Sequence, residues 1–167
     1  MNKQNFRYGV DQLSIGLALE IAEGRLAGIL NKEACEKIQQ SRAWVNAVVS
    51  NEQVVYGVTT GFGPLCTTLV AKELTQELQH NLLKSHSVGV GKPIPKKVAK
   101  LMLILKAQAL SQGYSGIRLQ TLERILWHID NDVIPFVPEK GSVGASGDLA
   151  PLSHLFLPLI GLGKVYH

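Results

Sequence analysis

Apolar residues recur at helical spacing along this 167-residue chain, and that periodicity constrains the fold more than any other feature of the sequence. The repeats predict helices over the following ranges: 31–49, 72–86, 96–112 and 117–132. A shorter helix is expected within residues 11–29, interrupted by Gly16 and Gly24. The pattern therefore predicts a mainly α fold.

The predicted helices differ in how clearly their ends and faces are marked. Asn31 can start the helix over 31–49, because its side-chain oxygen can accept from a free amide of the first turn. For residues 96–112 the expected apolar face comprises Val98, Leu101, Met102, Leu105 and Ala109. For residues 117–132 it comprises Leu122, Ile125, Leu126 and Ile129. These faces are the expected core-facing sides.

Composition narrows the class of protein. An apolar content of 46% allows a buried core. The net charge of +4 is mild, and the basic residues are scattered, with Lys96 and Lys97 the tightest pair. A nucleic-acid-binding protein more often shows a basic stripe with interleaved aromatics, so a nucleic-acid partner is not expected.

Compartment and metal content are inferred from the same features. The first residues lack the apolar run of a signal peptide, and no apolar stretch is long enough to span a bilayer. Cys35 and Cys66 lie far apart without metal-ligand spacing, as expected of free thiols in a reducing compartment. We therefore expect a cytoplasmic protein without a membrane partner or a metal site.

Two glycine-rich segments interrupt the helical pattern. They are YGVTTGFG at residues 56–63 and GSVGASGDLAP at 141–151, and both are predicted to be irregular loops. Loops on a rigid scaffold often carry binding and catalytic residues. Tyr56 in the first loop is either a core aromatic or a catalytic base. His86, at the end of the second predicted helix, either caps that helix or binds a ligand, whereas His128 and His154 are assigned to packing or to the surface.

The second loop has three interpretations. A phosphate cradle or a nucleophile elbow is disfavoured, because the P-loop ending and the G-x-S-x-G pattern are missing and no strand is predicted before the loop. A tight turn before a helix begun by Asp148 and Pro151 is what composition alone favours. Alternatively, the amide nitrogen of Gly147 attacks the carbonyl carbon of Ala145, and loss of water from Ser146 leaves an electrophilic methylidene on the new ring.

Four blocks of sequence resemble the aromatic amino acid ammonia-lyases and aminomutases that use a methylidene-imidazolone group. The blocks are VYGVTTGFGPL at 55–65, LLKSHSVGVG at 82–91, LSQGYSGIR at 110–118 and GSVGASGDLAPLSHL at 141–155. They occur in the order and at about the spacing typical of that family. The resemblance covers most of the chain from residue 40 onward.

The resemblance implies that the prosthetic group forms from this chain, with no external cofactor. Ala145, Ser146 and Gly147 match the tripeptide that cyclises, and Ser146 supplies the methylidene carbon. Asp148 matches the acid that helps to hold the turn. Tyr56 matches the tyrosine that removes the β-proton of the substrate.

Further positions in the resemblance bear on the substrate. Gly63 lies in the loop that closes beside the tyrosine, and Ser85 with His86 matches the pair that varies with substrate, here similar to histidine lyases. Thr59 departs from the asparagine of many histidine lyases. The resemblance implies elimination of ammonia from L-histidine to give trans-urocanate. Tyrosine or phenylalanine lyase and aminomutase activities are the alternatives.

The resemblance also implies architecture and assembly. Residues 1–167 would form a single partial domain, the amino-terminal helical domain of the ammonia-lyase (fumarase/aspartase-like) fold with two Gly-rich active-site loops. The chain would stop before the long central helix bundle, so the carboxy-terminal helical part would be absent. A homotetramer is expected of the full-length protein.

The isolated chain is expected to be inactive and to expose the apolar faces of helices 96–112 and 117–132. A non-catalytic truncated relative that associates with a complete subunit is the alternative.

Overall fold

The computed structural model describes residues 5–61, 74–143 and 147–167. Its helices are α1 (Ile15–Ala22), α2 (Lys32–Ser50), α3 (Thr75–His86), α4 (Lys96–Leu110), α5 (Leu119–Asp130), α6 (Leu149–Phe156) and the 3-10 helix η3 (Leu157–Ile160). Its strands are β1 (Phe6–Arg7), β2 (Gly28–Ile29), β3 (Val90–Pro93), β4 (Ile134–Pro135), β5 (Pro138–Lys140) and β6 (Val165–Tyr166). The predicted mainly α fold is confirmed.

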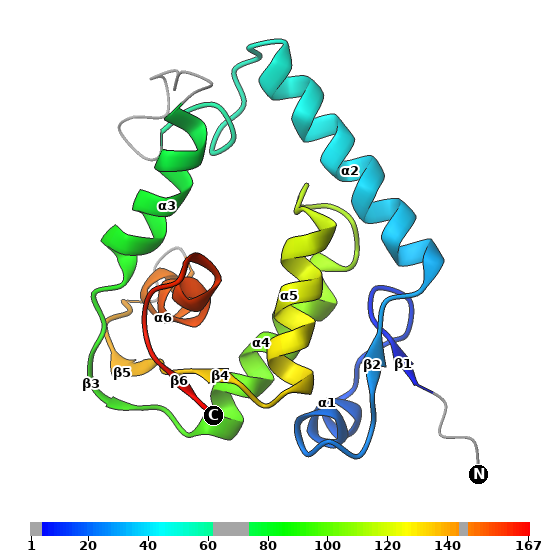
Figure 1. The fold of residues 1–167 in the computed structure, drawn as a ribbon, viewed down its shortest axis with the longest axis vertical. Coiled ribbons are helices and arrows are strands. Elements are labelled where there is room, and N and C mark those ends of the chain that lie inside the picture. Colours follow the sequence, from blue (N-terminus) through cyan, green and yellow to red (C-terminus); the bar gives the residue numbers. More distant parts are fainter. Residues whose placement is uncertain (1–4, 62–73, 144–146) are drawn as a thin grey trace.

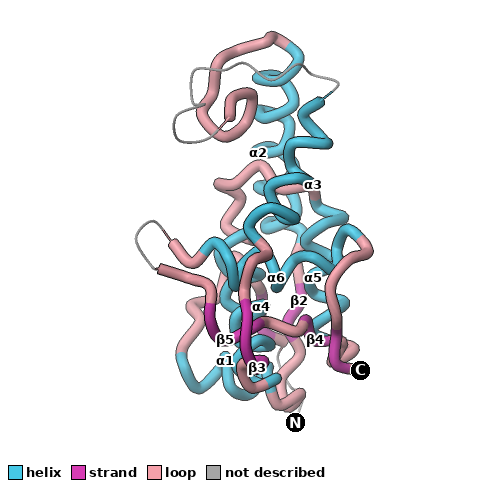
Figure 2. Tube along the Cα trace, turned by 90° about the vertical axis from the view of Figure 1, so that its left-hand side faces the viewer, coloured by secondary structure: helices cyan, strands magenta, loops and turns pink. Residues whose placement is uncertain are grey.

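The helices are arranged around a central pair. Helices α4 and α5 pack together, α1 packs on α4, and α3 packs on α6. Figure 1 shows α2 and α3 on opposite sides of the molecule, with α5 and α6 between them. Figure 2 shows that the C-terminus lies at the end of the molecule opposite the segment that directly follows α2.

Three short strand pairs tie the ends of the helices together. Strands β1 and β2 are parallel, whereas β3 pairs with β5 and β4 pairs with β6 in antiparallel fashion. None was predicted, because strands of two to four residues are too short to show a period of two in the sequence. The β3–β5 pair is the one that bears on function, because it joins the end of α3 to the start of the second glycine-rich loop.

The sequence located the helices well. Helix α2 begins as predicted, with the side chain of Asn31 accepting a 2.9 Å hydrogen bond from the amide of Ala34. The prediction that Gly16 would interrupt the first helix is wrong, because Gly16 lies inside α1. Ser14 caps α1 by accepting a hydrogen bond from the amide of Leu17, so the helix begins at Ile15, one residue before Gly16.

The core comprises apolar residues from α1, α2, α4, α5, α6 and the strands. Its members include Phe6, Tyr8, Ile38, Leu103, Ile104, Leu122, Ile125, Ile129, Ile134, Val137 and Leu155. The predicted face of α5 is buried, so the expectation that it would be exposed in the isolated chain is wrong. It packs on α4 within the chain itself.

The predicted face of α4 is partly wrong, because Leu101 and Met102 pack against the core but the other predicted positions are exposed. Val98 and Leu105 are 43% and 57% exposed, and the buried positions are instead Ala99, Leu103 and Ala107, together with Lys100 and Ile104. Lys100 lies on the buried side because its ammonium group reaches Asp132, with Nζ 2.9 Å from Oδ1. Lys100 therefore lies on the core-facing side of α4, although the spacing of apolar residues had predicted an entirely apolar core-facing side.

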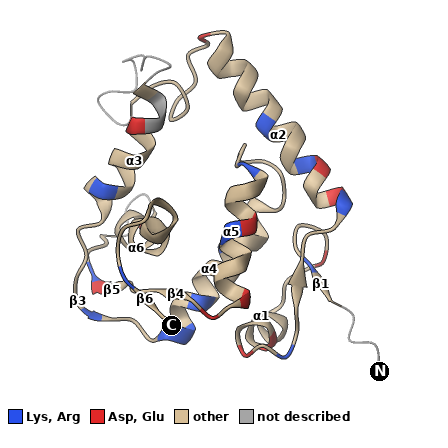
Figure 3. Ribbon diagram, in the orientation of Figure 1, with Lys and Arg blue, Asp and Glu red and all other residues tan. Residues whose placement is uncertain are grey.

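Charged residues are dispersed over the surface. On α2, Lys37 pairs with Glu33 and Lys32 with Glu36, each four residues apart. Figure 3 shows basic and acidic residues interspersed along this helix. No helix in the described part of the chain is long and apolar enough to cross a membrane.

Candidate active site

The first glycine-rich loop is a tight turn held by threonine side chains. The hydroxyl of Thr59 accepts from the amide of Val55 at 2.9 Å and donates to the carbonyl of Gln53 at 2.6 Å. Thr60 accepts from the amide of Gly57 at 3.3 Å. Both threonine side chains are buried. Their hydrogen bonds to the backbone hold the chain around Tyr56 in place, where no helix or strand does so.

Tyr56 projects from this turn. Its side chain is 62% exposed, so the core-aromatic interpretation is wrong. Gly63 lies outside the described residues, as does Cys66. Cys35 is a free cysteine, as predicted for it, and burial raises the pKa of its thiol.

Ser85 and His86 end helix α3. The ring nitrogen Nδ1 of His86 lies 2.9 Å from the carbonyl oxygen of Leu82, and the hydroxyl of Ser85 donates to the same oxygen at 3.2 Å. Because a carbonyl can only accept, Nδ1 carries the hydrogen of this bond. The structure thus supports the helix-capping role of His86, and the same bond orients Nε2 away from the helix backbone.

The second glycine-rich loop is bounded by β5 and α6. The presence of β5 means that the expectation of no preceding strand is wrong, although the loop still lacks the G-x-S-x-G pattern. Asp148 precedes α6 but makes no side-chain capping bond. Its Oδ1 instead accepts from the hydroxyl of Ser142 at 2.5 Å, joining the two flanks of the loop.

Only Gly147 of the tripeptide Ala145-Ser146-Gly147, which the resemblance implies to cyclise, lies within the described residues. Gly147 has φ of 104°, a conformation that other residues adopt at a cost, and a Cβ there would meet nothing within 4 Å. Ala145 and Ser146 lie outside the described residues. Gly147 therefore has a positive φ that suits a close backbone approach in the loop, which is the fit that the described structure offers for a methylidene-imidazolone group.

The structure brings the second loop and the end of α3 together. Val90 in β3 pairs with Lys140 in β5, and a Cβ built on Gly141 would lie 2.7 Å from Cα of Gly89. The amide of Gly89 also donates to Nε2 of His154 in α6 at 3.0 Å. The segment after Ser85 and His86 is therefore fixed against the helix that follows Gly147 and Asp148. Tyr56 is held separately, by the turn after α2.

His154 is the residue that sequence reasoning missed. It was assigned to packing or to the surface, yet its Nε2 accepts from Gly89, 65 positions earlier in the chain. Burial lowers the pKa of His154, which favours the neutral ring that this bond needs. Its place in the LSHL segment near the ASG tripeptide was the only available signal. His128 is a buried packing residue, as predicted.

Within residues 5–61, 74–143 and 147–167, no three His, Cys, Asp or Glu side chains are grouped as metal ligands would be. The described candidate site comprises a tyrosine on a rigid turn, a serine–histidine pair at a helix end and an acid-flanked glycine at a loop. These groups can bind a polar ligand and exchange a proton with it.

Comparison with known proteins identifies the class. Residues 13–167 match the family described as aromatic amino acid lyase, and the chain belongs to that family. It is 45% identical over 157 residues to a histidine ammonia-lyase of Streptococcus pyogenes serotype M3, a match that covers 94% of this chain and 31% of the relative. The chain thus spans about a third of the length of that relative.

Solved structures support the same fold. A tyrosine aminomutase from Streptomyces globisporus superposes with a TM-score of 0.90 at 34% identity, covering 98% of this chain and 31% of that one. A histidine ammonia-lyase from Trypanosoma cruzi gives a TM-score of 0.86 at 34% identity, covering 97% and 31%. The described fold is the amino-terminal portion of the ammonia-lyase fold, as predicted.

Proposed function

We propose that this chain is the amino-terminal part of an ammonia-lyase that converts L-histidine to trans-urocanate and ammonia. The observation that carries the proposal is the 45% identity to a histidine ammonia-lyase, combined with Ser85 and His86 at the position that varies with substrate. The helix-capping bond of His86 uses Nδ1 and not Nε2. That nitrogen can accept a hydrogen bond from an N–H of a substrate imidazole.

The prosthetic group is proposed to form from Ala145, Ser146 and Gly147 without an external cofactor. It would supply an electrophilic carbon that binds the amino group of the substrate and makes ammonia a better leaving group. Gly147 contributes the attacking amide nitrogen, and its positive φ allows the close backbone approach. Asp148, bonded to Ser142, would hold the loop in that geometry.

Tyr56 is the proposed base. Removal of the weakly acidic β-proton needs an acceptor close to the substrate, and a phenol oxygen on a rigid turn can provide it. In this chain the side chain of Tyr56 is 62% exposed, and a base in open water loses much of its advantage. We therefore expect the 167-residue chain alone to release no measurable urocanate, and the whole protein to act as a homotetramer.

The cyclisation is tested by mass. Trypsin should release residues 141–164 as one peptide, because Lys140 and Lys164 bound a segment without other lysine or arginine. In the whole polypeptide that the gene encodes, ring formation removes two waters, so this peptide should be lighter by roughly 36 Da. The S146A variant should show the full mass. An unmodified wild-type peptide would contradict the proposal and favour the non-catalytic alternative, a partner that only associates with a complete subunit.

The substrate is tested by product analysis of the whole polypeptide. L-histidine should yield urocanate, and tyrosine and phenylalanine should yield little product. The likeness to a tyrosine aminomutase, with a TM-score of 0.90, favours aminomutase activity as the second candidate. An aminomutase retains the ammonia, so a β-amino acid product with no released ammonia would replace the lyase proposal with this one.

A further inference from the structure

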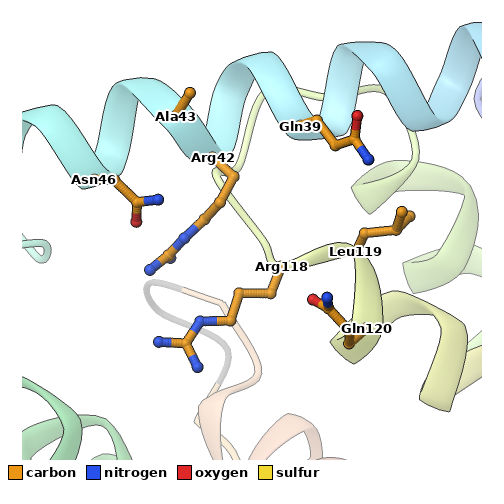
Figure 4. Close-up of a pocket in the computed structure, with 7 residues that line it drawn as sticks. All are labelled: Gln39, Arg42, Ala43, Asn46, Arg118, Leu119 and Gln120. Atoms are coloured by element: carbon orange, nitrogen blue, oxygen red, sulfur yellow. The ribbon is translucent and has the colours of Figure 1, made fainter.

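A pocket of about 210 Å³ lies between α2 and the start of α5, and its lining includes none of the described residues that the sequence analysis assigned to the reaction. It is lined from α2 by Gln39, Arg42 and Asn46 and from α5 by Arg118, Leu119 and Gln120. Figure 4 shows the two arginine side chains extending to the same side of the pocket. Its volume is several times the ~30 Å³ share of one liquid water, so it can hold a small polyatomic ion.

The pocket is built by specific contacts between α2 and the segment before α5. The amide of Gly116 donates to the hydroxyl of Ser41 at 2.9 Å, and Nη1 of Arg42 donates to the carbonyl of Gly116 at 3.2 Å. Gly116 has φ of 64°, and a Cβ there would lie 2.2 Å from Cγ2 of Val45. The close packing at this glycine holds the backbones of α2 and of the segment before α5 together, so that both arginines extend from a fixed base before any ligand binds.

The charge of the pocket is not balanced by acidic residues. Neither Arg42 nor Arg118 forms an ion pair with Asp or Glu in the part of the chain that the structure describes. Burial, and then the nearby charge of Arg118, lower the pKa of Arg42. Two guanidinium groups that repel each other are stabilised together by an oxyanion placed between them.

The start of α5 adds positive potential to the same pocket. Serine, threonine, asparagine and aspartate are favoured at a helix N-cap, but here the N-cap is Arg118, which makes no side-chain capping bond. The first turn of this 12-residue helix holds no acidic residue. Its first amides lack intrahelical acceptors, so a cation at this cap is unfavourable unless an anion lies beside it.

We propose that the Arg42–Arg118 pocket binds a phosphate-type oxyanion, either as the free ion or as the phosphate group of a small phosphorylated molecule. A phosphate offers three or more acceptor oxygens to two guanidinium groups and to the side-chain amide of Asn46, which Figure 4 shows on the same side as the Arg42 guanidinium. A carboxylate offers only two. The dianion also matches the charge of two arginines better than a monoanion does.

Calorimetric titration of the 167-residue chain with inorganic phosphate, at constant low ionic strength maintained with chloride, tests the proposal. We expect saturable binding of one phosphate, weakened about tenfold or more in R42Q and in R118Q, because each loses a hydrogen-bonding charge. The R124Q variant is the matched control and should bind as the wild type does. Arg124 is also on α5, but its guanidinium lies 4.0 Å over the ring of Trp127 and not at the pocket.

Nuclear magnetic resonance adds a readout that is independent of variant folding. Phosphate should shift the backbone amide signals of Leu119 and Gln120 in the wild-type chain, and chloride at the same ionic strength should not. R118K keeps the charge but loses the planar fork, so it should bind more weakly than the wild type and better than R118Q. A phosphate monoester that binds more tightly than inorganic phosphate identifies a phosphorylated molecule as the ligand, and the reverse order identifies the free ion.

Three results would overturn the proposal: titration without saturation, phosphate binding that survives both R42Q and R118Q, or equal amide shifts with chloride. Concentration-dependent self-association that R118Q abolishes, without phosphate binding, would also overturn it. That result would mean that an acidic side chain of a second copy occupies the pocket.

Discussion

The backbone amide of Gly89 donates a 3.0 Å hydrogen bond to Nε2 of His154, and this bond joins the segment after α3 to helix α6. A Cβ on Gly89 would lie 3.0 Å from that same nitrogen, so the backbone approaches the ring as closely as only a glycine allows. Ser85 and His86 lie just before Gly89, and Gly147 and Asp148 lie just before α6. The contact therefore fixes the two halves of the candidate site relative to each other.

His154 should make the stability of the chain depend on pH. Its pKa is lowered in the folded chain because burial disfavours the imidazolium, so the unfolded chain binds the proton at a higher pH. The stability that the neutral ring contributes is present above the ordinary value of 6.5 and is lost as the pH falls through the lowered folded value. We expect H154L to destabilise the chain by about 1 kcal/mol at pH 8.

At pH 5 the same substitution should cost less, because the unfolded wild-type chain binds a proton at His154 more readily than the folded chain does, which already lowers the stability of the wild type there. Urea unfolding of both proteins at the two pH values gives the comparison, and every other titrating group is shared by the pair. An H154L penalty that does not change with pH would show that His154 acts only by packing.

Thr59 should be essential to the turn that carries Tyr56. Its buried hydroxyl makes two hydrogen bonds, to Val55 and to Gln53, and valine has the same shape without the hydroxyl. T59V should therefore lower the free energy of unfolding by about 1–3 kcal/mol. T59S keeps the hydroxyl and should recover most of that loss in the same denaturation experiment. Equal stability of T59V and wild type would mean that the turn is held by other contacts.

The helices could be predicted from the sequence because periodicity and capping are local. Asn31 caps α2, and the face of α5 that contains Leu122 and Ile129 is buried, as their spacing indicates. The face of α4 could not be fixed in the same way. Apolar residues occur around most of that helix, and the position of Lys100 depends on Asp132, which lies 32 residues further along the chain.

The candidate site was predictable only where a motif identified it. Tyr56, Ser85, His86 and Asp148 were assigned by resemblance, and no periodicity points to them. The Gly89–His154 contact and the Arg42–Arg118 pocket join residues that lie 65 and 76 positions apart in the chain. Such pairings arise from tertiary packing, which a single sequence does not reveal.

The corrected face of α4 can be tested with two neighbouring residues. Ile104 is fully buried, whereas Leu105 is 57% exposed and was placed on the core face by periodicity. I104A should lower the free energy of unfolding by about 2–5 kcal/mol, because it leaves a cavity in the core. L105A should change it by no more than about 0.5 kcal/mol. Urea denaturation of the two variants decides between the two faces, and the opposite order would restore the face predicted from the sequence.

The bond between Ser142 and Asp148 should matter for maturation more than for stability. The two side chains are exposed, so D148A should change the free energy of unfolding by less than about 1 kcal/mol. The bond joins the flanks of the loop at 2.5 Å, and its loss should let the loop relax out of the geometry that ring closure needs. In the whole polypeptide, D148A and S142A should therefore yield a smaller fraction of the 141–164 tryptic peptide in the form lighter by roughly 36 Da.

D148N keeps an acceptor oxygen, so its fraction of the lighter peptide should fall between those of D148A and wild type. E139Q, two residues before the loop begins, serves as the control for a lost carboxylate. Complete maturation of D148A would assign Asp148 a role other than holding the loop.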